Sequence, residues 1–349
     1  MRGIENRGLV VAGLGAGSLD YILPFPGDYA PGSDEPWELW PGHIPGEKAM
    51  LTPEEVAFLE KAKELESHIG GNAINSLAWI AAQESVDQAR LLTAIGYGDA
   101  ASEAIAAHLQ RVNITDEHLL RVGGYLPSIA AIEHEAKGSD RMVRSRKRGP
   151  MSDYMSDEYL TNGMQGADVV LTASLKDTNL MERAFELVPS DAFLTFNPSV
   201  SEIKNSHDRQ EMLRIMRSHD LGLLALNETE LPYLMGINQE LSISEVRKLA
   251  ERTSLSHARY VLCTLGKDGL LLAQDGYSTL QPISPVPKEQ IGTTLGAGDR
   301  AHAVAALRIA EGIRNNNLDH GVVLGEAAES TAHLVRFNGP HQDIYDKAA

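Results

Sequence analysis

The chain has 349 residues, of which 43% are hydrophobic and 23% are charged, and its net charge is −17. This composition indicates a globular protein with a sizeable core and excludes disordered, collagen-like and coiled-coil proteins. The excess of acidic side chains repels polyanions, which argues against nucleic acid and against an anionic membrane surface as partners.

Residues 1–7 lack the apolar segment of a signal peptide, and no stretch reaches the roughly 20 apolar residues of a membrane-spanning helix. We therefore expect a cytoplasmic protein with no membrane partner. The single cysteine, Cys263, has apolar neighbours, which predicts a buried strand position rather than a nucleophile.

The chain opens with an apolar run at residues 9–13, which predicts a buried strand followed by a turn of small residues. Residues 24–53 are crowded with proline, glycine and acidic side chains, which predicts a long loop. Thr52 is typical of a helix N-cap, because proline and two glutamates follow it in the first turn. We expect this helix to run to about His68.

From residue 70 onward, apolar runs alternate with amphipathic segments, beginning with a helix after Gly70 and Gly71. The alternation predicts an α/β fold in which a doubly wound, mostly parallel sheet is flanked by helices, in one domain over residues 1–349. The remaining strands are expected at residues 89–95, 168–171, 192–196, 221–225 and 260–264.

Two extended runs, residues 128–135 and 141–148, interrupt the alternation and predict a hairpin. We expect this hairpin and the loop near the N-terminus to form a small β lid. The lid would be contributed by about residues 21–52 and 124–150.

The segment 293–299 (Thr-Thr-Leu-Gly-Ala-Gly-Asp) precedes an alanine-rich helix. Backbone N–H groups at a glycine-rich helix start bind anions, so Gly296, Ala297 and Gly298 are candidates for holding a phosphoryl group in transfer. A carboxylate in the first turn, Asp299, is placed to accept the proton of an attacking hydroxyl. The alternative is an ordinary glycine turn with an aspartate that caps a helix.

Three further segments accompany this one in order: residues 70–75 (Gly-Gly-Asn-Ala-Ile-Asn), 227–230 (Asn-Glu-Thr-Glu) and 264–269 (Thr-Leu-Gly-Lys-Asp-Gly). Together the four resemble the signatures of the ribokinase or PfkB-type carbohydrate kinase family, over about residues 9 to 340. The layout is most similar to the adenosine kinase branch, which residues 13–20 (Gly-Leu-Gly-Ala-Gly-Ser-Leu-Asp) also resemble. The resemblance implies a ribokinase-like fold and transfer of the γ-phosphoryl group of ATP to a primary hydroxyl of a sugar or ribonucleoside.

For the substrate, the resemblance implies binding by Asp20, Gly71 and Asn75. A carboxylate at the C-terminal end of a strand can accept hydrogen bonds from two vicinal hydroxyls, although Asp20 could equally be a solvated loop residue. In the basic hairpin, Arg144 or Arg146 is a hypothetical phosphate ligand, because a planar guanidinium pairs well with oxygens. A solvated hairpin face is the alternative.

For the nucleotide, the resemblance implies contacts from Asn227, Thr264, Gly266 and Gly269. Asn227 and Glu230 are three residues apart, a spacing expected to place both on one helical face, and they resemble the family's pair that arranges Mg²⁺ and the nucleotide phosphates, with Glu230 acting through water. The cofactors expected are therefore ATP and Mg²⁺. Surface polar residues and a simple strand–turn–strand hairpin are the alternatives.

Three departures from the family pattern qualify these expectations. Thr293 stands where relatives commonly have an aspartate that contributes to a monovalent-cation site, which argues against potassium activation. Arg300 and His302 replace a small residue and an aromatic one, and Arg300 is expected to place a cation beside Asp299. Ala16 stands where adenosine kinases tend to have asparagine, so the identity of the nucleoside or sugar stays open.

Two other functions remain as alternatives. The segment 13–18 superficially suggests a dinucleotide-binding oxidoreductase, but Ser18 stands where a third glycine or alanine is needed and prolines interrupt the following segment. A catalytically reduced protein of the kinase fold that senses a nucleotide or sugar is the more serious alternative, and turnover of a phosphate donor distinguishes the two.

The partner expected is thus a small sugar or nucleoside. Relatives often pair through their lids, and Trp37, Leu39 and Trp40 are candidates for such a homodimer contact. The same three side chains could instead pack against their own domain.

Overall fold

A central sheet runs through the computed structural model, which describes residues 7–23, 67–123, 125, 127–134, 141–145, 151–175, 177–198, 203, 206–287, 290–291, 294–337, 341 and 343–344. Within these ranges the sheet has 10 strands in the order β14-β13-β12-β11-β10-β9-β1-β4-β5, with β6 also paired to β4. The strands are β1 (Leu9–Gly15), β4 (Val86–Ile95), β5 (Ile114–Thr115), β6 (Leu119–Arg121), β9 (Val169–Ala173), β10 (Phe193–Asn197), β11 (Leu223–Asn227), β12 (Tyr260–Thr264), β13 (Leu270–Gln274) and β14 (Tyr277–Gln281).

Most neighbouring strands of this sheet are parallel. Every pair from β5 through β12 is parallel, whereas β13 and β14 are added as antiparallel strands at one edge. Parallel strands with helices on both faces are buried on both sides, which is why their sequences are nearly continuous apolar runs. The predicted fold class is confirmed.

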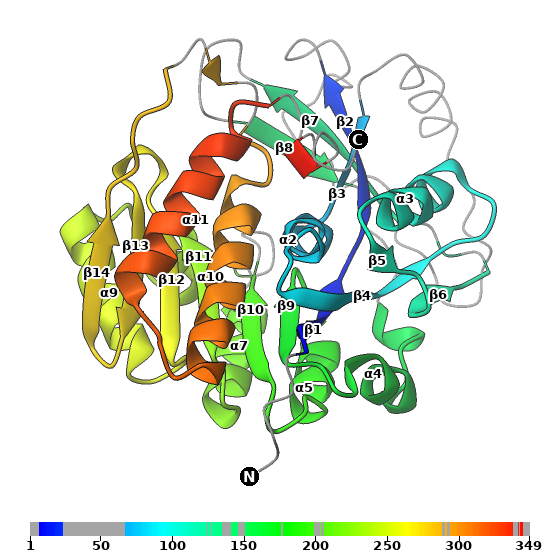
Figure 1. Cartoon of the computed structure of the whole chain (residues 1–349), viewed down its shortest axis with the longest axis horizontal. Coiled ribbons are helices and arrows are strands. Elements are labelled where there is room, and N and C mark those ends of the chain that lie inside the picture. Colours follow the sequence, from blue (N-terminus) through cyan, green and yellow to red (C-terminus); the bar gives the residue numbers. More distant parts are fainter. Residues whose placement is uncertain are drawn as a thin grey trace.

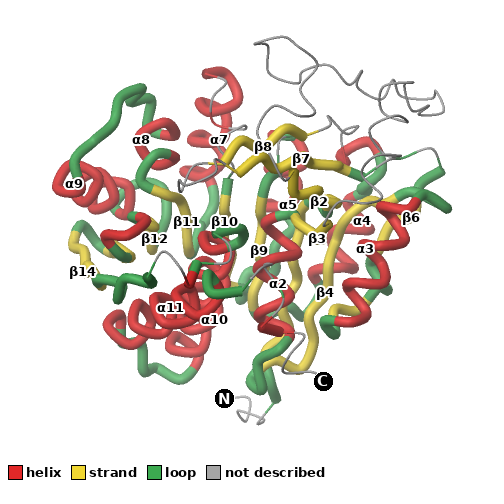
Figure 2. Tube along the Cα trace, turned by 90° about the horizontal axis from the view of Figure 1, so that it is seen from above, coloured by secondary structure: helices red, strands yellow, loops and turns green. Residues whose placement is uncertain are grey.

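Helices cover both faces of the sheet (Figures 1 and 2). One face carries α2 (Asn72–Ala81), α3 (Ala100–Arg111), α10 (Ala297–Arg314) and α11 (His320–Leu334). The other carries α4 (Asp157–Met164), α5 (Thr178–Glu186), α7 (Ser206–Ser218), α8 (Glu230–Leu234) and α9 (Ile243–Ser254). Alternate residues of β1 enter the two cores, Val11 on the first face and Ala12 on the second. No helix in the described ranges is long and apolar enough to cross a membrane.

A second, 4-stranded sheet in the order β3-β2-β7-β8 follows the carboxyl end of β1 and lies at the top of the view in Figure 1. Its strands are β2 (Ser18–Leu23), β3 (Ser67–Gly70), β7 (Ser128–His134) and β8 (Arg141–Ser145). Strands β7 and β8 are antiparallel, so the predicted hairpin is confirmed. Because only two residues separate the end of β1 from the start of β2, this sheet is held next to the carboxyl edge of the central sheet.

Three local predictions need correction or limitation. The first strand extends through Gly15, because β9 pairs with it as far as Ala173, and only a short connection remains before β2. The prediction that a helix runs to about His68 is wrong at its C-terminal end. His68 lies in β3 and pairs with Asp20 of β2. The loop 24–53 and most of that helix lie outside the described residues. Cys263 is fully buried in β12, as predicted.

Candidate active site at the carboxyl edge of the sheet

The start of α10 is open on the side where a ligand would approach. Gly296 precedes the helix with a left-handed φ of 75°, a conformation that favours glycine. A Cβ atom added to Gly298 would meet no other atom within 4 Å. The space beside Gly298 therefore lies open at the positive end of the helix dipole, while the N–H of Ala297 donates a hydrogen bond of 3.3 Å to the carbonyl oxygen of Thr294.

Asp299 lies in that first turn and is held by side chains from two other elements. Its Oδ2 accepts a hydrogen bond of 2.8 Å from Nδ2 of Asn75 on α2, and its Oδ1 accepts one of 3.2 Å from Nδ2 of Asn197 at the end of β10. Its carbonyl oxygen accepts a third, of 3.1 Å, from Ser76 Oγ. The residue is only 8% exposed, and these donors set the orientation of its carboxylate at the helix start.

The double glycine explains how the substrate-side residues come close to this carboxylate. A Cβ atom on Gly70 would lie 2.0 Å from Oδ2 of Asp20, and one on Gly71 would lie 2.1 Å from the carbonyl oxygen of Ala16. Gly71 also has φ 104° and precedes α2 directly, one turn before Asn75. Only glycines allow this close approach of β2, β3 and α2. The structure thus places Asp20, Gly71, Asn75 and Asp299 in one continuous cluster.

Asp20 and Asn75 carry side-chain oxygens of a kind that accepts hydrogen bonds from hydroxyls. Asp20 is 7% exposed and lies within β2, not in a solvated loop, and its Oδ1 accepts a 2.7 Å hydrogen bond from Ser18 Oγ. Among the described residues, Oδ1 of Asn75 is buried and has no hydrogen-bond partner. A buried acceptor of this kind is costly unless a donor fills it, and a ligand hydroxyl would do so.

The residues expected to bind nucleotide lie farther along the same edge. Asn227 ends β11 and pairs in register with Thr264, which ends β12. Oδ1 of Asn227 accepts hydrogen bonds from the N–H groups of Thr229 and Glu230, and Oε2 of Glu230 accepts one of 2.9 Å from the N–H of Asn227. The expectation of a shared helical face is wrong, because Asn227 belongs to a strand and Glu230 opens α8.

Gly266 and Gly269 form the turn between β12 and β13, with φ values of 53° and 115°. A Cβ atom on Gly269 would lie 2.1 Å from the carbonyl oxygen of Gln281, so no larger residue fits. The Gly266 turn faces Oε1 of Glu228, which would be 3.5 Å from a Cβ there. Burial raises the pKa of Glu228, and the carboxylate of Asp268 adds to this effect.

Arg300 and His302, the two unusual residues after Asp299, are both buried. The guanidinium of Arg300 donates to both carboxylate oxygens of Asp343, at 2.8 and 3.0 Å. The expectation that Arg300 places a cation beside Asp299 is therefore wrong. The reason is that successive side chains on a helix point about 100° apart. Burial lowers the pKa of His302 to about 3, and its Nε2 lies 3.0 Å from Oγ1 of Thr195.

Arg144 lies in β8, where its backbone pairs opposite Ala131. Arg146 and Thr293 lie outside the described residues. The same is true of the candidates for a homodimer contact, Trp37, Leu39 and Trp40.

Sequence reasoning did not place Asn197, Ser76 or Asp343 at this site. Asn197 belongs to the Phe-Asn-Pro-Ser segment and Ser76 follows Asn75, so both stood beside recognised motifs. Asp343 carried no local signal, because its partner Arg300 is 43 residues away.

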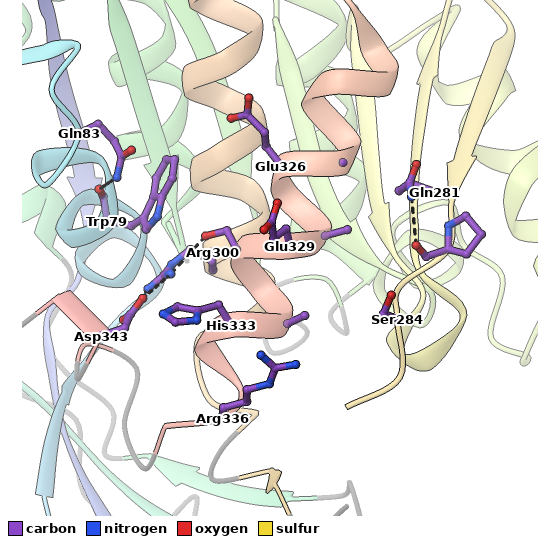
Figure 3. A pocket seen from close by; sticks show the side chains of 15 residues that line it. Trp79, Gln83, Gln281, Ser284, Arg300, Glu326, Glu329, His333, Arg336 and Asp343 are labelled. Atoms are coloured by element: carbon purple, nitrogen blue, oxygen red, sulfur yellow. Dashed lines mark hydrogen bonds and ion pairs between the residues drawn. The ribbon is translucent and has the colours of Figure 1, made fainter. Parts of the chain in front are cut away.

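A pocket of about 670 Å³ lies elsewhere, over α11 (Figure 3). Trp79 of α2 and Gln83, just after that helix, line one side, and Gln281 and Ser284 line the other. It contains none of the residues expected at the site, and only Arg300 connects it with the first turn of α10. The hydrogen bonds around Asp299, rather than this pocket, define the candidate active site.

A family model described as pfkB family carbohydrate kinase matches residues 49–332. No curated protein matches the chain in sequence. Ribokinase from Thermotoga maritima has a TM-score of 0.68 with 19% identity, covering 97% of this chain and 99% of its own. Adenosine kinase from Sinorhizobium meliloti has a TM-score of 0.69 with 15% identity, covering 98% and 100%.

A third solved structure, Arabidopsis thaliana ribokinase complexed with ribose and ATP, has a TM-score of 0.68 with 17% identity over 95% of this chain and 94% of its own. At these identities the likeness concerns the fold. The chain therefore shares its fold with these ribokinases and with this adenosine kinase.

Proposed function

Because the chain belongs to the pfkB family of carbohydrate kinases, and is thus a phosphotransferase with an alcohol group as acceptor, we propose that it transfers the γ-phosphoryl group of ATP to a primary hydroxyl of a sugar or ribonucleoside. The observation that carries this proposal is the placement of Asp299. Two amide side chains orient its carboxylate, beside a helix start that is open at Gly298.

In this proposal Asp299 is the general base. Its carboxylate accepts the proton of the acceptor hydroxyl as that oxygen attacks the phosphorus atom, while Asn75 and Asn197 prevent it from turning away. The N–H groups of Gly296, Ala297 and Gly298 stabilise the negative charge of the transferring group, since they are oriented before the reaction begins. Positioning and charge stabilisation then account for most of the rate.

The acceptor is bound by the cluster that the double glycine makes possible. The carboxylate of Asp20 accepts hydrogen bonds from neighbouring hydroxyls of a sugar or ribose ring, and the free Oδ1 of Asn75 accepts another. Gly71 lets the backbone of Ala16 approach closely and would so form one wall of the acceptor site. We assign Arg144 to the lid side of this site, and the lid segments, about 21–52 and 124–150, to the exclusion of water during transfer.

ATP as donor is supported by the fold relative that is complexed with ribose and ATP. Asn227, Thr264, Gly266 and Gly269 would bind this nucleotide. Within the described residues no group of three or more His, Cys, Asp or Glu side chains could hold a metal directly. Mg²⁺ is usually held by one or two carboxylates together with phosphates and water, and Glu230 is the residue proposed to hold it here. Mg²⁺ would neutralise charge on the phosphates.

The test is ATP consumption with Mg²⁺ across nucleosides, free sugars and sugar phosphates, by the wild type and by Asp299→Asn. We expect one acceptor class to be turned over and the variant to lose activity by about 10²- to 10⁴-fold while its melting temperature stays near that of the wild type. Asp220→Asn, at an exposed ion pair with Arg259, is the matched control and should retain full activity.

An Asp299→Asn variant with wild-type turnover would exclude Asp299 as the base. If no acceptor is turned over but some raise the melting temperature of the wild type, the protein is a sensor with the kinase fold.

A further inference from the structure

Three residues near the C-terminus, His341, Asp343 and Ile344, are buried between separate elements. Their exposed fractions are 3%, 5% and 6%. Ile344 enters the core shared by α2, α10 and α11. Burial of polar side chains at the end of a chain needs specific partners, because unpaired polar groups in a core are costly.

Asp343 ties this segment to α10 and α11. Both its oxygens accept hydrogen bonds from the guanidinium of Arg300, and Nη1 of Arg300 also donates to Oγ of Ser330 at 3.3 Å. The side chains of Arg300 and Asp343 are 3% and 4% exposed. Figure 3 shows the two joined by dashed lines, below Trp79 and beside His333. A bidentate ion pair of this kind fixes the relative orientation of the two side chains as well as the distance between them.

His341 ties the same segment to the small sheet and to α3. Its Nε2 forms a 3.2 Å hydrogen bond to the carbonyl oxygen of Ile69 in β3. Its ring also lies against that of His108, with 4.6 Å between centroids. The segment therefore contacts both the catalytic helix and the strand that carries the double glycine.

The two contacts flank the candidate active site. Arg300 directly follows Asp299, and Ile69 directly precedes Gly70 and Gly71. We propose that His341, Asp343 and Ile344 form a clasp that sets the position of β3 and its neighbour β2 relative to the start of α10. Arg300, Asp343 and His341 are then positioning residues that bring the acceptor bound at Asp20 within reach of Asp299. The catalytic part of this inference rests on the proposed function.

A contribution to folding stability does not by itself explain why the ion pair between Arg300 and Asp343 is buried. The free-energy cost of removing two charges from water is about as large as the gain from their mutual attraction. Replacing a buried ion pair with apolar side chains of similar volume therefore often leaves stability unchanged. Removal of one partner, in contrast, leaves an uncompensated buried charge. This asymmetry provides a test in which the clasp is cut without destabilising the fold.

The test compares the double variant Arg300→Met/Asp343→Leu with the matched control Arg259→Met/Asp220→Leu, which makes the same changes at an exposed pair. We expect the clasp variant to melt within about 5 °C of the wild type. Amide hydrogen exchange should accelerate in a peptide covering residues 67–71. With the identified acceptor, kcat should fall by about 10- to 100-fold while KM for ATP changes less than about threefold. The control should show none of these effects.

A second variant, His341→Phe, keeps the pair with Arg300 and removes only the hydrogen bond to Ile69. It should accelerate exchange at residues 67–71 but not in the first turn of α10, and it should also lower kcat. This variant tests the contact of the clasp with β3 instead of its contact with α10. Its result does not depend on whether the double variant folds.

Unchanged exchange at residues 67–71 in both variants would overturn the clasp. Faster exchange with kcat equal to the control would overturn its role in positioning and leave a structural brace. If the wild type turns over no acceptor, the proposed function fails separately. The exchange measurement alone then decides whether the segment holds β3 against α10.

Discussion

Small residues at this site serve two distinct purposes. Gly71 has φ 104° and lies against the carbonyl oxygen of Ala16, so its role is to let the backbone of two elements meet. Gly298 has an ordinary helical position and open space before it. If the proposed function holds, that space belongs to the ligand.

Alanine substitutions separate the two purposes. Gly71→Ala should lower the free energy of unfolding by about 2–5 kcal/mol, because it combines a disfavoured φ with a steric overlap. Gly298→Ala should change it by less than about 1 kcal/mol, because alanine suits a helix. It should nevertheless reduce kcat/KM for ATP by about tenfold or more through the added methyl group. Denaturant unfolding and steady-state kinetics measure both.

Either of two results would contradict this reading of the glycines. Full activity in Gly298→Ala would mean that no ligand approaches the first turn of α10. Normal stability in Gly71→Ala would mean that Ala16 and its neighbours move aside easily.

At the scale of elements, the connection from β11 to α8 holds the candidate metal residue. Asn227 and Glu230 each accept hydrogen bonds from the other's part of the backbone. The same i, i+3 pattern occurs at the start of α9, where Oε2 of Glu245 accepts from the backbone N–H of Ser242. The two arrangements differ in their location. Only the pair of Asn227 and Glu230 lies at the carboxyl edge of the sheet, beside Thr264.

Glutamine substitution at both positions tests the role of the charge. Glu230→Gln retains an oxygen acceptor for Asn227 but loses the negative charge that would attract Mg²⁺. We expect the Mg²⁺ concentration for half-maximal activity to rise at least about fivefold with little change in melting temperature. Glu245→Gln, the matched control, should leave the Mg²⁺ dependence unchanged. Equal Mg²⁺ curves for both variants would remove Glu230 from metal binding.

At the scale of the whole molecule, histidines buried in the uncharged form make stability depend on pH. Burial lowers the pKa of His302 to about 3. Burial and the nearby Arg111 charge lower that of His108 to about 4. Burial, with neighbouring cationic groups, lowers that of His341 well below its usual range. In the unfolded chain each histidine regains a pKa near 6.5, so below that pH the unfolded state binds more protons than the folded state.

Stability should therefore fall as pH decreases from about 6.5 toward 4, with each of these histidines contributing about 1.4 kcal/mol per pH unit. The measurement is the free energy of unfolding at several pH values between 6 and 4.5. His302→Gln should reduce the slope by about one proton, whatever its effect on stability at pH 7. An exposed histidine, His333, provides the control variant His333→Gln. An unchanged slope in His302→Gln would show that His302 is not held neutral.

The sequence by itself determined the fold class, the hairpin and the motifs that identify the family. These depend on local patterns: apolar runs typical of parallel strands, and glycine turns whose residues are neighbours along the chain. The start of α10 could be located in this way, because Gly296 to Asp299 are contiguous.

The side chains that surround Asp299 and the direction of Arg300 follow from how the elements pack in three dimensions. Asn75 and Asn197 reach Asp299 across 224 and 102 residues, and Asp343 reaches Arg300 across 43. Strand pairing with β2 likewise made His68 part of a strand rather than a helix. Such contacts depend on how separate elements pack, and a local pattern of residue types contains no information about the partner that packing will supply.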